Sequence, residues 1–450
     1  MLDDRFSGSH SAATPAAIAA YEVAVASVAA HRPGAAEALG EALAHAPGMI
    51  AAHALKGFGA VLLARAEMFP PARNALALAR KAMDRSGASA GEAALVAALG
   101  EAAEGRLLAA SVVLDRHLAG NPRDFTALKL AHGLRFMSGD EPGMLATTTR
   151  CIGAWTPDMP GYGFVLGCHA FGLEEAGDLA GAERAGLSAV EHEPRDAWGL
   201  HAVSHVYEMD GRTTAGIALL DKARPMWTQC HNFSYHMAWH LALYQLARGR
   251  ADLALAVYDA DVRPVATDDF RDIANAVSLL WRLKQEHADT GDRWHELEQL
   301  ARKRATDTTL IFASLHHLLT LLAAGDLAAA RGLVASIGRR AREGHCDQAG
   351  VAATVGEDLG LALLGLGQTP GLRPDLARIA RDLPLIGGSH AQRDVFLRSL
   401  ALLAAQGGRT GEARAVLDVR RRQRGDDRFS ALVREQLAVA QKNSGLKLAS

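Results

Sequence analysis

The chain is dominated by amphipathic helical periodicity. Apolar residues recur every three to four positions, as in the Ala-, Leu- and Arg-rich segment 325–340, which is the spacing of one face of an α-helix. No segment shows the period-two alternation of β-branched and aromatic residues that half-buried strands need. The pattern predicts an all-α protein without strands.

A two-helix repeat organises these helical segments. Each copy has a helical stretch, a glycine followed by arginine or aspartate, and a second helical stretch with a small residue five positions after the glycine. The clearest copies are Gly105 with Ala110, Gly177 with Ala182, Gly249 with Ala254, Gly325 with Ala330, and Gly408 with Ala413. Less regular copies have Gly139, Gly211, Gly291 and Gly367, and consecutive glycines are 34 to 42 residues apart.

The repeat has a mechanical basis. Glycine tolerates positive φ and so ends the first helix tightly, and the small residue lets the second helix pack close to the first. Pro122 and Pro194 each follow a turn glycine by 17 residues and terminate second helices. A period near 34 residues is typical of tetratricopeptide repeats. The sequence therefore predicts about eleven helical hairpins stacked into an α-solenoid superhelix, with first helices lining its concave face.

Composition and charge exclude several partners. With 48 Lys and Arg against 50 Asp and Glu, the net charge of −2 offers no basic excess for nucleic acid or an anionic membrane. Neither a secretory signal nor a run of about 18 apolar residues appears, so we expect a cytoplasmic protein without membrane spans. Four scattered cysteines argue against a disulfide framework and a cysteine-based zinc site. No linker divides the chain, which predicts one domain over residues 1–450 with frayed ends at 1–12 and 440–450.

Histidines cluster on two neighbouring first helices. His201, His205 and Glu208 are spaced four and then three residues apart, so they share one helical face. His236 and His240 repeat the four-residue spacing one repeat later. Because packed helix axes lie about 8 to 10 Å apart, both pairs can point into one volume.

Three interpretations of this cluster stay open. The histidines are solvated or satisfied within the core, as single histidines often are. Alternatively, His201, His205, His236 and His240 bind a divalent metal such as zinc, with Glu208 as ligand or base. In the third interpretation, the same five residues are catalytic acid and base groups without a metal, and Glu208 orients an imidazole. The His-Glu-x-x-His and Glu-x-x-His signatures of known metal helices are missing.

A second motif starts a helix near the C-terminus. Gly387 and Gly388 allow a sharp turn, and Ser389 is a good N-cap. A helix start with a cation beside it suits a carboxylate or phosphate, which makes the following polar residues candidates for substrate binding: His390, Gln392 and Arg393. Alternatively, Ser389 is only a cap, and Arg393 pairs with Asp394 or with a carboxylate of another repeat.

Further residues are candidates for the lining of a substrate pocket. They are His169, Trp198, His231, Tyr235 and Trp239. Trp198 lies on the same helical side as His201 and is the best candidate for a pocket wall. The other aromatic residues also suit packing between helices, and His231 suits the loop before the second histidine helix. The basic run 420–424, followed directly by two aspartates, predicts a solvated surface of mixed charge.

Three segments resemble a known family. They read HAVSHVYEMDGR at 201–212, HNFSYHMAWHLALY at 231–244 and GGSHAQRDVF at 387–396. Together they look like the tetratricopeptide repeat protein 38 family, and the resemblance covers almost the whole chain. It implies the helical-repeat fold and the candidate residues named above, and it leaves the reaction open.

Two functions are compatible with the sequence. The first is a closed helical cup that binds, and by hydrolase or lyase chemistry transforms, a small polar or anionic molecule at the histidine cluster. The second is a scaffold that binds a peptide in its concave groove. The sequence has many histidines and glutamates but no basic ladder on the first helices, so we favour the cup. The oligomeric state is left open, with a homo-oligomer as one alternative.

Overall fold

The computed structural model describes residues 1–365 and 374–448. Its N-terminal elements are β1 (Leu2–Asp3), β2 (Ser9–His10), α1 (Pro15–Ala29), α2 (Ala35–His45), α3 (Ile50–Val61), α4 (Phe69–Ser86), α5 (Ala90–Ala102), α6 (Leu107–Gly120), α7 (Phe125–Ser138), α8 (Glu141–Ile152), α9 (Tyr162–Glu175), α10 (Leu179–His192) and α11 (Ala197–Met209). The later elements are α12 (Thr213–Trp227), α13 (Phe233–Ala247), α14 (Ala251–Val257), α15 (Phe270–Gln285), α16 (Trp294–Lys303), α17 (Ile311–Ala324), α18 (Leu327–Glu343), α19 (Asp347–Val351), α20 (Glu357–Leu363), α21 (Leu376–Asp382), α22 (His390–Gln406), α23 (Thr410–Arg424) and α24 (Arg428–Leu448). Short 3₁₀ or π segments accompany them at Ala66–Met68, Tyr258–Val262, Ala352–Gly356 and Leu383–Ile386.

The predicted helical hairpins are confirmed. All five turn glycines of the clearest repeat copies have positive φ, between 67° and 87°. The five alanines that follow them are completely buried, at 0% exposure, where the second helix packs on the first. Where aspartate follows the glycine, its side chain caps the second helix, as Asp178 and Asp326 do. The less regular turn at Gly367 lies outside the described residues.

Residue contacts divide the chain into two compact units. The first unit comprises Met1–Val206 and Leu220–Met237, and the second comprises Tyr207–Leu219 and Ala238–Ser450. The prediction of a single domain over residues 1–450 stays a prediction. The boundaries fall inside α11, α12 and α13 rather than in a linker, so composition carried no signal for them.

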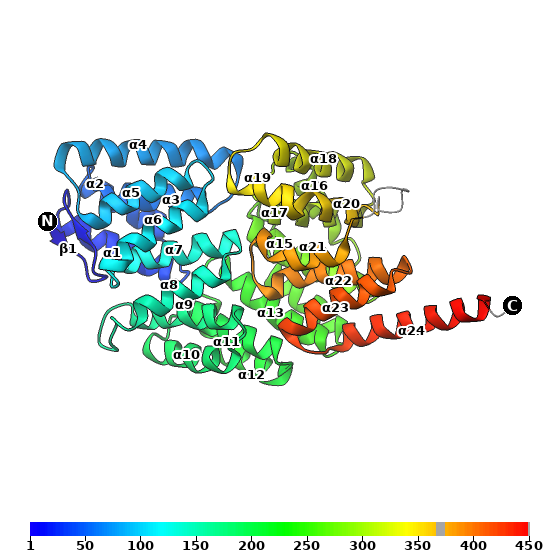
Figure 1. Ribbon diagram of the computed structural model, residues 1–450. Coiled ribbons are helices and arrows are strands. Elements are labelled where there is room, and N and C mark those ends of the chain that lie inside the picture. The colour runs from blue at the N-terminus through cyan, green and yellow to red at the C-terminus, as the bar shows by residue number, and fades with distance from the viewer. Residues whose placement is uncertain (366–373, 449–450) are drawn as a thin grey trace. The chain divides into compact units, whose positions relative to one another are not determined.

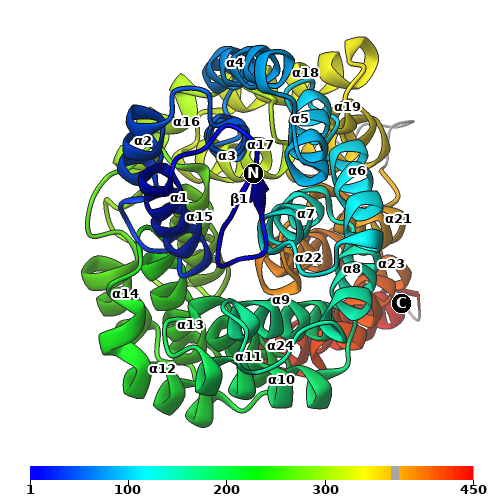
Figure 2. The ribbon, with the colours of Figure 1, turned by 90° about the vertical axis from the view of Figure 1, so that its left-hand side faces the viewer.

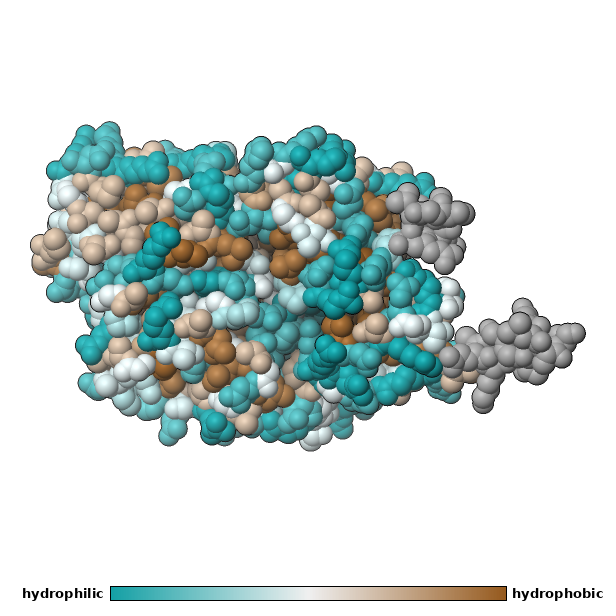
Figure 3. Space-filling view, in the orientation of Figure 1, coloured by the Kyte–Doolittle hydropathy of each residue, from teal (hydrophilic) through white to brown (hydrophobic). Residues whose placement is uncertain are grey.

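Helical hairpins also build each unit. In the first unit α3 packs on α4 and α9 packs on α10, as Figure 1 and Figure 2 show. The outer face of α4 is hydrophilic, at the upper left of Figure 3, while its alanines at 72, 75 and 79 are buried. In the second unit α16 packs on α17 and α22 packs on α23. Among the described residues, none of the helices combines the length and apolar character that a membrane span requires.

The N-terminus differs from the expectation of a frayed, strand-free end. β1 pairs with β2 in a short antiparallel hairpin, and Asp4, Phe6 and His10 are buried. Nε2 of His10 lies 2.7 Å from Oδ2 of Asp4, and the ring of His10 contacts the buried Tyr21 of α1. These contacts hold a segment that is too short to show strand periodicity. At the other end, residues 440–448 continue α24 and residues 449–450 lie outside the described residues.

Candidate functional site

The helices α11 and α13 carry the histidines that the sequence analysis singled out. His201 and His205 lie one turn apart on α11, and His236 lies in the first turn of α13, all within the first unit. Before α11, the fully buried Asp196 accepts a hydrogen bond from the backbone N–H of Trp198 at 3.2 Å, which fixes the first turn. The four-residue spacing then directs both α11 imidazoles to one helical face.

The Nε2 atoms of these three imidazoles converge. Nε2 of His201 lies 2.9 Å from Nε2 of His236 and 2.9 Å from Nε2 of His205. The exposed fractions of His201, His205 and His236 are 1%, 0% and 9%. An imidazole nitrogen has either one in-plane lone pair or one hydrogen, so Nε2 of His201 cannot form two linear hydrogen bonds at once. Hydrogen bonding explains one of the two contacts, whereas a shared cation explains both.

Two carboxylates face the other ring nitrogen of His205. Oε2 of Glu174 lies 3.3 Å and Oε1 of Glu175 lies 3.9 Å from Nδ1 of His205, and both side chains are at most 1% exposed. A carboxylate in this position fixes the tautomer of a metal-binding histidine and raises its basicity. The His205 proton is therefore expected on Nδ1, which leaves the lone pair of Nε2 directed at His201.

Aromatic rings enclose the three imidazoles. Phe171 stacks on His201 with ring centroids 5.4 Å apart, and the rings of Trp198 and Phe233 lie 4.9 Å and 5.2 Å from the same imidazole. His31, from the turn after α1, stacks on Phe233 at 4.3 Å. These rings give the cluster a low-dielectric surrounding, in which electrostatic interactions are stronger than in water. Trp198, the predicted pocket wall, thus lies against His201.

The other two predicted catalytic residues lie in the second unit. His240 of α13 is completely buried, and its Nδ1 lies 3.0 Å from Oε2 of Glu208 on α11. Glu208 is 5% exposed, and its other oxygen lies 3.4 Å from Nη1 of Arg424. This arrangement fits the role of orienting an imidazole that the sequence analysis gave to Glu208.

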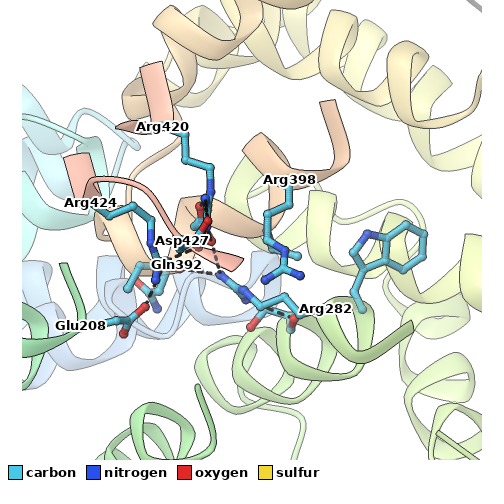
Figure 4. Close-up of polar contacts among 12 residues, drawn as sticks. Glu208, Arg282, Gln392, Arg398, Arg420, Arg424 and Asp427 are labelled. Atoms are coloured by element: carbon cyan, nitrogen blue, oxygen red, sulfur yellow. Dashed lines mark hydrogen bonds and ion pairs between the residues drawn. The ribbon is translucent and has the colours of Figure 1, made fainter. Parts of the chain in front are cut away.

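A buried network of arginines and carboxylates continues from Glu208. Arg424 lies 3.2 Å from Oδ2 of Asp394, and Arg420 donates from Nε to Oδ1 of Asp394 at 2.6 Å. Arg282 approaches the same carboxylate at 3.9 Å. In Figure 4, Arg424 points toward Glu208 while Arg282 extends toward the network from another helix. The prediction that the basic run 420–424 is a solvated surface is wrong for Arg420 and Arg424, although Arg421 is exposed.

The charges of the network shift its pKa values. Burial alone would raise the pKa of the Asp394 carboxyl, but the guanidiniums of Arg420 and Arg424 outweigh it and hold that pKa well below its usual range. Burial lowers the pKa of Arg282 to about 9, even though Asp394 opposes the shift. Asp394 is therefore charged at any physiological pH.

The predicted substrate-binding residues are scattered. His169 is half-buried, its Nδ1 lies 3.2 Å from Oγ1 of Thr148, and burial lowers its pKa. His231 is exposed in the loop before α13, as expected, and Tyr235 is half-buried. Trp239 is completely buried and lies under the guanidinium of Arg282, 5.5 Å away, which is a packing role.

The motif near the C-terminus forms a capping box. The hydroxyl of Ser389 accepts from the backbone N–H of Gln392, and the side chain of Gln392 accepts from the backbone N–H of Ser389. Arg393 is 1% exposed; it donates to the carbonyl of Gly388 and lies 2.8 Å from Nδ1 of His390. Ser389 is thus a cap, as the simpler interpretation holds, and Gln392 completes it. Anion binding by His390 and Arg393 stays a prediction.

Sequence reasoning missed several members of these clusters. Glu174 and Glu175 end a helix, where the helix dipole disfavours acidic residues, and this local cost was the signal that could have drawn attention to them. Arg420 and Arg424 are one helical turn apart, which suggested one shared face but not its burial. Arg282 and Asp394 carried no local signal, because their partners are distant in sequence.

Comparisons with known proteins give one distant structural similarity. The chain matches no protein-family model. It is similar to a chain in the solved structure of Naa15/Naa10 bound to HypK-THB, with 14% sequence identity and a TM-score of 0.30. The match covers 85% of this chain and 65% of that chain, so this chain spans somewhat less than two thirds of the length of its neighbour.

Proposed function

We propose that this helical-repeat protein binds a divalent transition metal of the zinc class through Nε2 of His201, His205 and His236. The observation that carries the proposal is the convergence of three Nε2 atoms, with both contacts to His201 at 2.9 Å. In a tetrahedral site with Zn–N bonds of about 2.0–2.1 Å, neighbouring ligand nitrogens lie about 3.3 Å apart. The two separations of 2.9 Å would therefore each lengthen by about 0.4 Å to accommodate the ion.

The donor set supports a transition metal over calcium or magnesium. Imidazole nitrogen suits zinc, copper, nickel and iron, whereas calcium and magnesium require oxygen ligands. Glu174, at 3.3 Å from Nδ1 of His205, supplies the carboxylate that typically supports a metal-binding histidine.

We further propose membership of the tetratricopeptide repeat protein 38 family, because two of the segments that carry the resemblance contain all three ligands.

If these three histidines are the only ligands, a tetrahedral zinc ion has one coordination position left for water or a substrate. A zinc ion in such a site lowers the pKa of bound water to about 7, which is the chemistry of hydrolases. Hydrolase or lyase action on a small polar or anionic molecule therefore remains part of this proposal.

Peptide binding by the helical-repeat scaffold stays a prediction from the sequence. The four free cysteines suit a reducing compartment, so we also propose a cytoplasmic location.

Metal content tests the proposal directly. The protein would be stripped with chelator, titrated with Co²⁺ as a spectroscopic substitute for Zn²⁺, and assayed for metal by mass spectrometry. We expect one equivalent bound and the visible absorption of a nitrogen-rich site. His205→Ala should abolish both signals. His53→Ala removes another buried histidine of the first unit, bonded to the carbonyl of Pro47 instead, and should keep them.

A milder variant tests the metal centre even if His205→Ala does not fold. Glu174→Gln keeps the ligands and removes the charge behind His205, so the affinity for the metal should fall about 10- to 100-fold. Circular dichroism would verify the helical content of each variant. A wild-type protein without a bound equivalent, or equal metal binding in His205→Ala, would refute the metal centre.

A further inference from the structure

Lys129 is a half-buried cation on α7 of the first unit. Its Nζ lies 3.8 Å from Sγ of Cys168, whose side chain is completely buried. Among the residues that the structure describes, no carboxylate lies within ion-pair distance of this ammonium. An ammonium offers three hydrogens, and a sulfur atom is only a weak acceptor. Because a cation withdrawn from water needs strong acceptors, Lys129 has capacity for a further one.

Asp196 is a buried carboxyl group near Lys129, but it does not neutralise the ammonium in full. Its Oδ1 accepts from the backbone N–H of Trp198 at 3.2 Å, so this side chain serves the start of α11. Burial raises the pKa of Asp196 to about 7, although the ammonium of Lys129 opposes the shift. At neutral pH Asp196 therefore carries only part of a negative charge. The ammonium keeps an excess of positive charge at this place.

The indole of Trp198 links the ammonium to the histidine cluster. Nζ of Lys129 lies 5.2 Å from the centre of the Trp198 ring, which is a cation–π distance, and the imidazole of His201 lies 4.9 Å from Trp198. These two distances limit the separation of the ammonium from the His201 ring to at most about 10 Å. Nε1 of Trp198 donates to Nε2 of His132 at 3.1 Å, and His31 stacks on the indole. The indole is thus fixed from several directions and holds the ammonium beside the cluster.

We propose that Lys129 binds the oxyanion group of a small molecule, a carboxylate or a phosphate, next to the histidine cluster. The inference rests on the proposed metal centre for the other contact of this molecule, and it names the class of substrate that the centre takes. An ammonium binds an oxyanion through charge-assisted hydrogen bonds, which are about twice as strong as those to a neutral group. The limit of about 10 Å lies within the reach of one small molecule that contacts both Lys129 and the metal. Lys129 therefore selects anions over neutral molecules.

Lysine NMR on the full-length, metal-free protein tests the anion contact by itself. Protein labelled with ¹³C-lysine would be titrated with inorganic phosphate and, separately, with acetate at constant ionic strength. The ε-methylene signal of Lys129, which the face of the indole shifts upfield, would be assigned by its loss in Lys129→Arg. We expect a saturable shift of this signal, and the anion that saturates it at the lower concentration shows whether phosphate or carboxylate is preferred. No saturable shift with either anion would overturn the proposal.

Substitution of the lysine tests its role beside the metal. The Co²⁺-loaded protein would be titrated with the preferred anion by calorimetry. In Lys129→Met the Kd for the anion should rise about 10-fold or more, while the protein still binds one equivalent of Co²⁺. Lys129→Arg keeps the charge and should retain most of the affinity. Lys56→Met replaces an exposed lysine on α3 of the same unit and is the matched control. A Kd in Lys129→Met equal to that of the wild type would refute the role of Lys129.

The two measurements separate this inference from the metal centre. A wild-type protein that binds no Co²⁺ but shows the saturable shift of Lys129 would refute the metal centre and support the anion site. A protein that binds Co²⁺ normally, with an affinity for the anion that does not depend on Lys129, would refute the anion site and leave the metal centre in place.

Discussion

Burial decides which charge states the histidines of this protein can adopt. A histidine without contact with water loses the solvation of its charged form, and a nearby carboxylate can offset that loss. His205 and His240 each have a carboxylate at Nδ1, at 3.3 Å and 3.0 Å. Burial instead lowers the pKa of His316 to about 3 and that of His317 to about 4. These two are neutral residues of the core.

At the residue scale, His316 and His317 should make the protein sensitive to acid. Their pKa values in the folded state lie below the value of about 6.5 in an unfolded chain, so below that pH the unfolded chain binds protons that the folded protein does not. Stability is therefore complete above about pH 6.5 and falls as the pH decreases toward 4. The urea midpoint, followed by circular dichroism, should fall over this range.

The substitution His316→Leu should reduce the loss, because it removes one of the two groups. His45→Leu is a suitable control, since this histidine is half-exposed at the end of α2. If the midpoint of His316→Leu decreases as steeply as that of the wild type, other groups control the acid response.

At the scale of elements, small residues set how closely the helices approach. A Cβ atom on Gly186 of α10 would lie 2.6 Å from Cγ2 of Val203 and 2.9 Å from the carbonyl oxygen of Gly199, both on α11. The carbonyl belongs to the backbone, so the clash cannot be relieved by a side-chain rotation. The close packing of α10 on α11 therefore requires glycine at this position, and α11 is the helix that carries His201 and His205.

Gly186→Ala should therefore destabilise the protein by about 1–3 kcal/mol, the usual cost of overpacking. Gly133→Ala in helix α7 is the matched control within the same unit. Apart from the backbone of its own helix, no atom lies within 4 Å of a Cβ added at Gly133. It should stabilise the helix by about 0.5–1 kcal/mol, since alanine loses less conformational entropy than glycine. Denaturant unfolding would measure both. Similar effects of the two substitutions would contradict the close approach.

At the scale of the whole molecule, each unit is built from two separate pieces of chain. The first unit needs Leu220–Met237 in addition to Met1–Val206. The later piece contributes Trp227, which is 1% exposed, and His236 of the histidine cluster. Because the chain leaves and re-enters each unit within helices, a cut at residue 206 removes part of the packing of the first unit.

A fragment of residues 1–248, which contains the complete first unit, should fold and bind the metal. A fragment of residues 1–206 lacks His236 and the packing of Trp227, so it should unfold without cooperativity and bind no metal. Thermal circular dichroism and the Co²⁺ titration would compare the two. Equal behaviour of the fragments would show that the piece 220–237 is dispensable for the first unit.

Local patterns predicted the helices because helix formation, glycine turns and proline stops depend on neighbours within a few residues. The buried alanines after Gly105 and Gly177 and the N-cap at Ser389 followed from the same local rules. Helical spacing also placed His201 and His205 on one face. The N-terminal hairpin and the two units did not follow, because they depend on contacts between distant segments.

The sequence alone determined the class of fold and the faces on which the histidines lie, since both repeat with helical periodicity. Only the tertiary structure decided what those faces meet. It brought Glu174 to Nδ1 of His205, and it brought Arg424 to Glu208 across 216 residues of sequence. It also buried Arg420, which periodicity had left on the surface. Burial and charge pairing depend on which helices pack together, and the sequence around each residue does not contain that information.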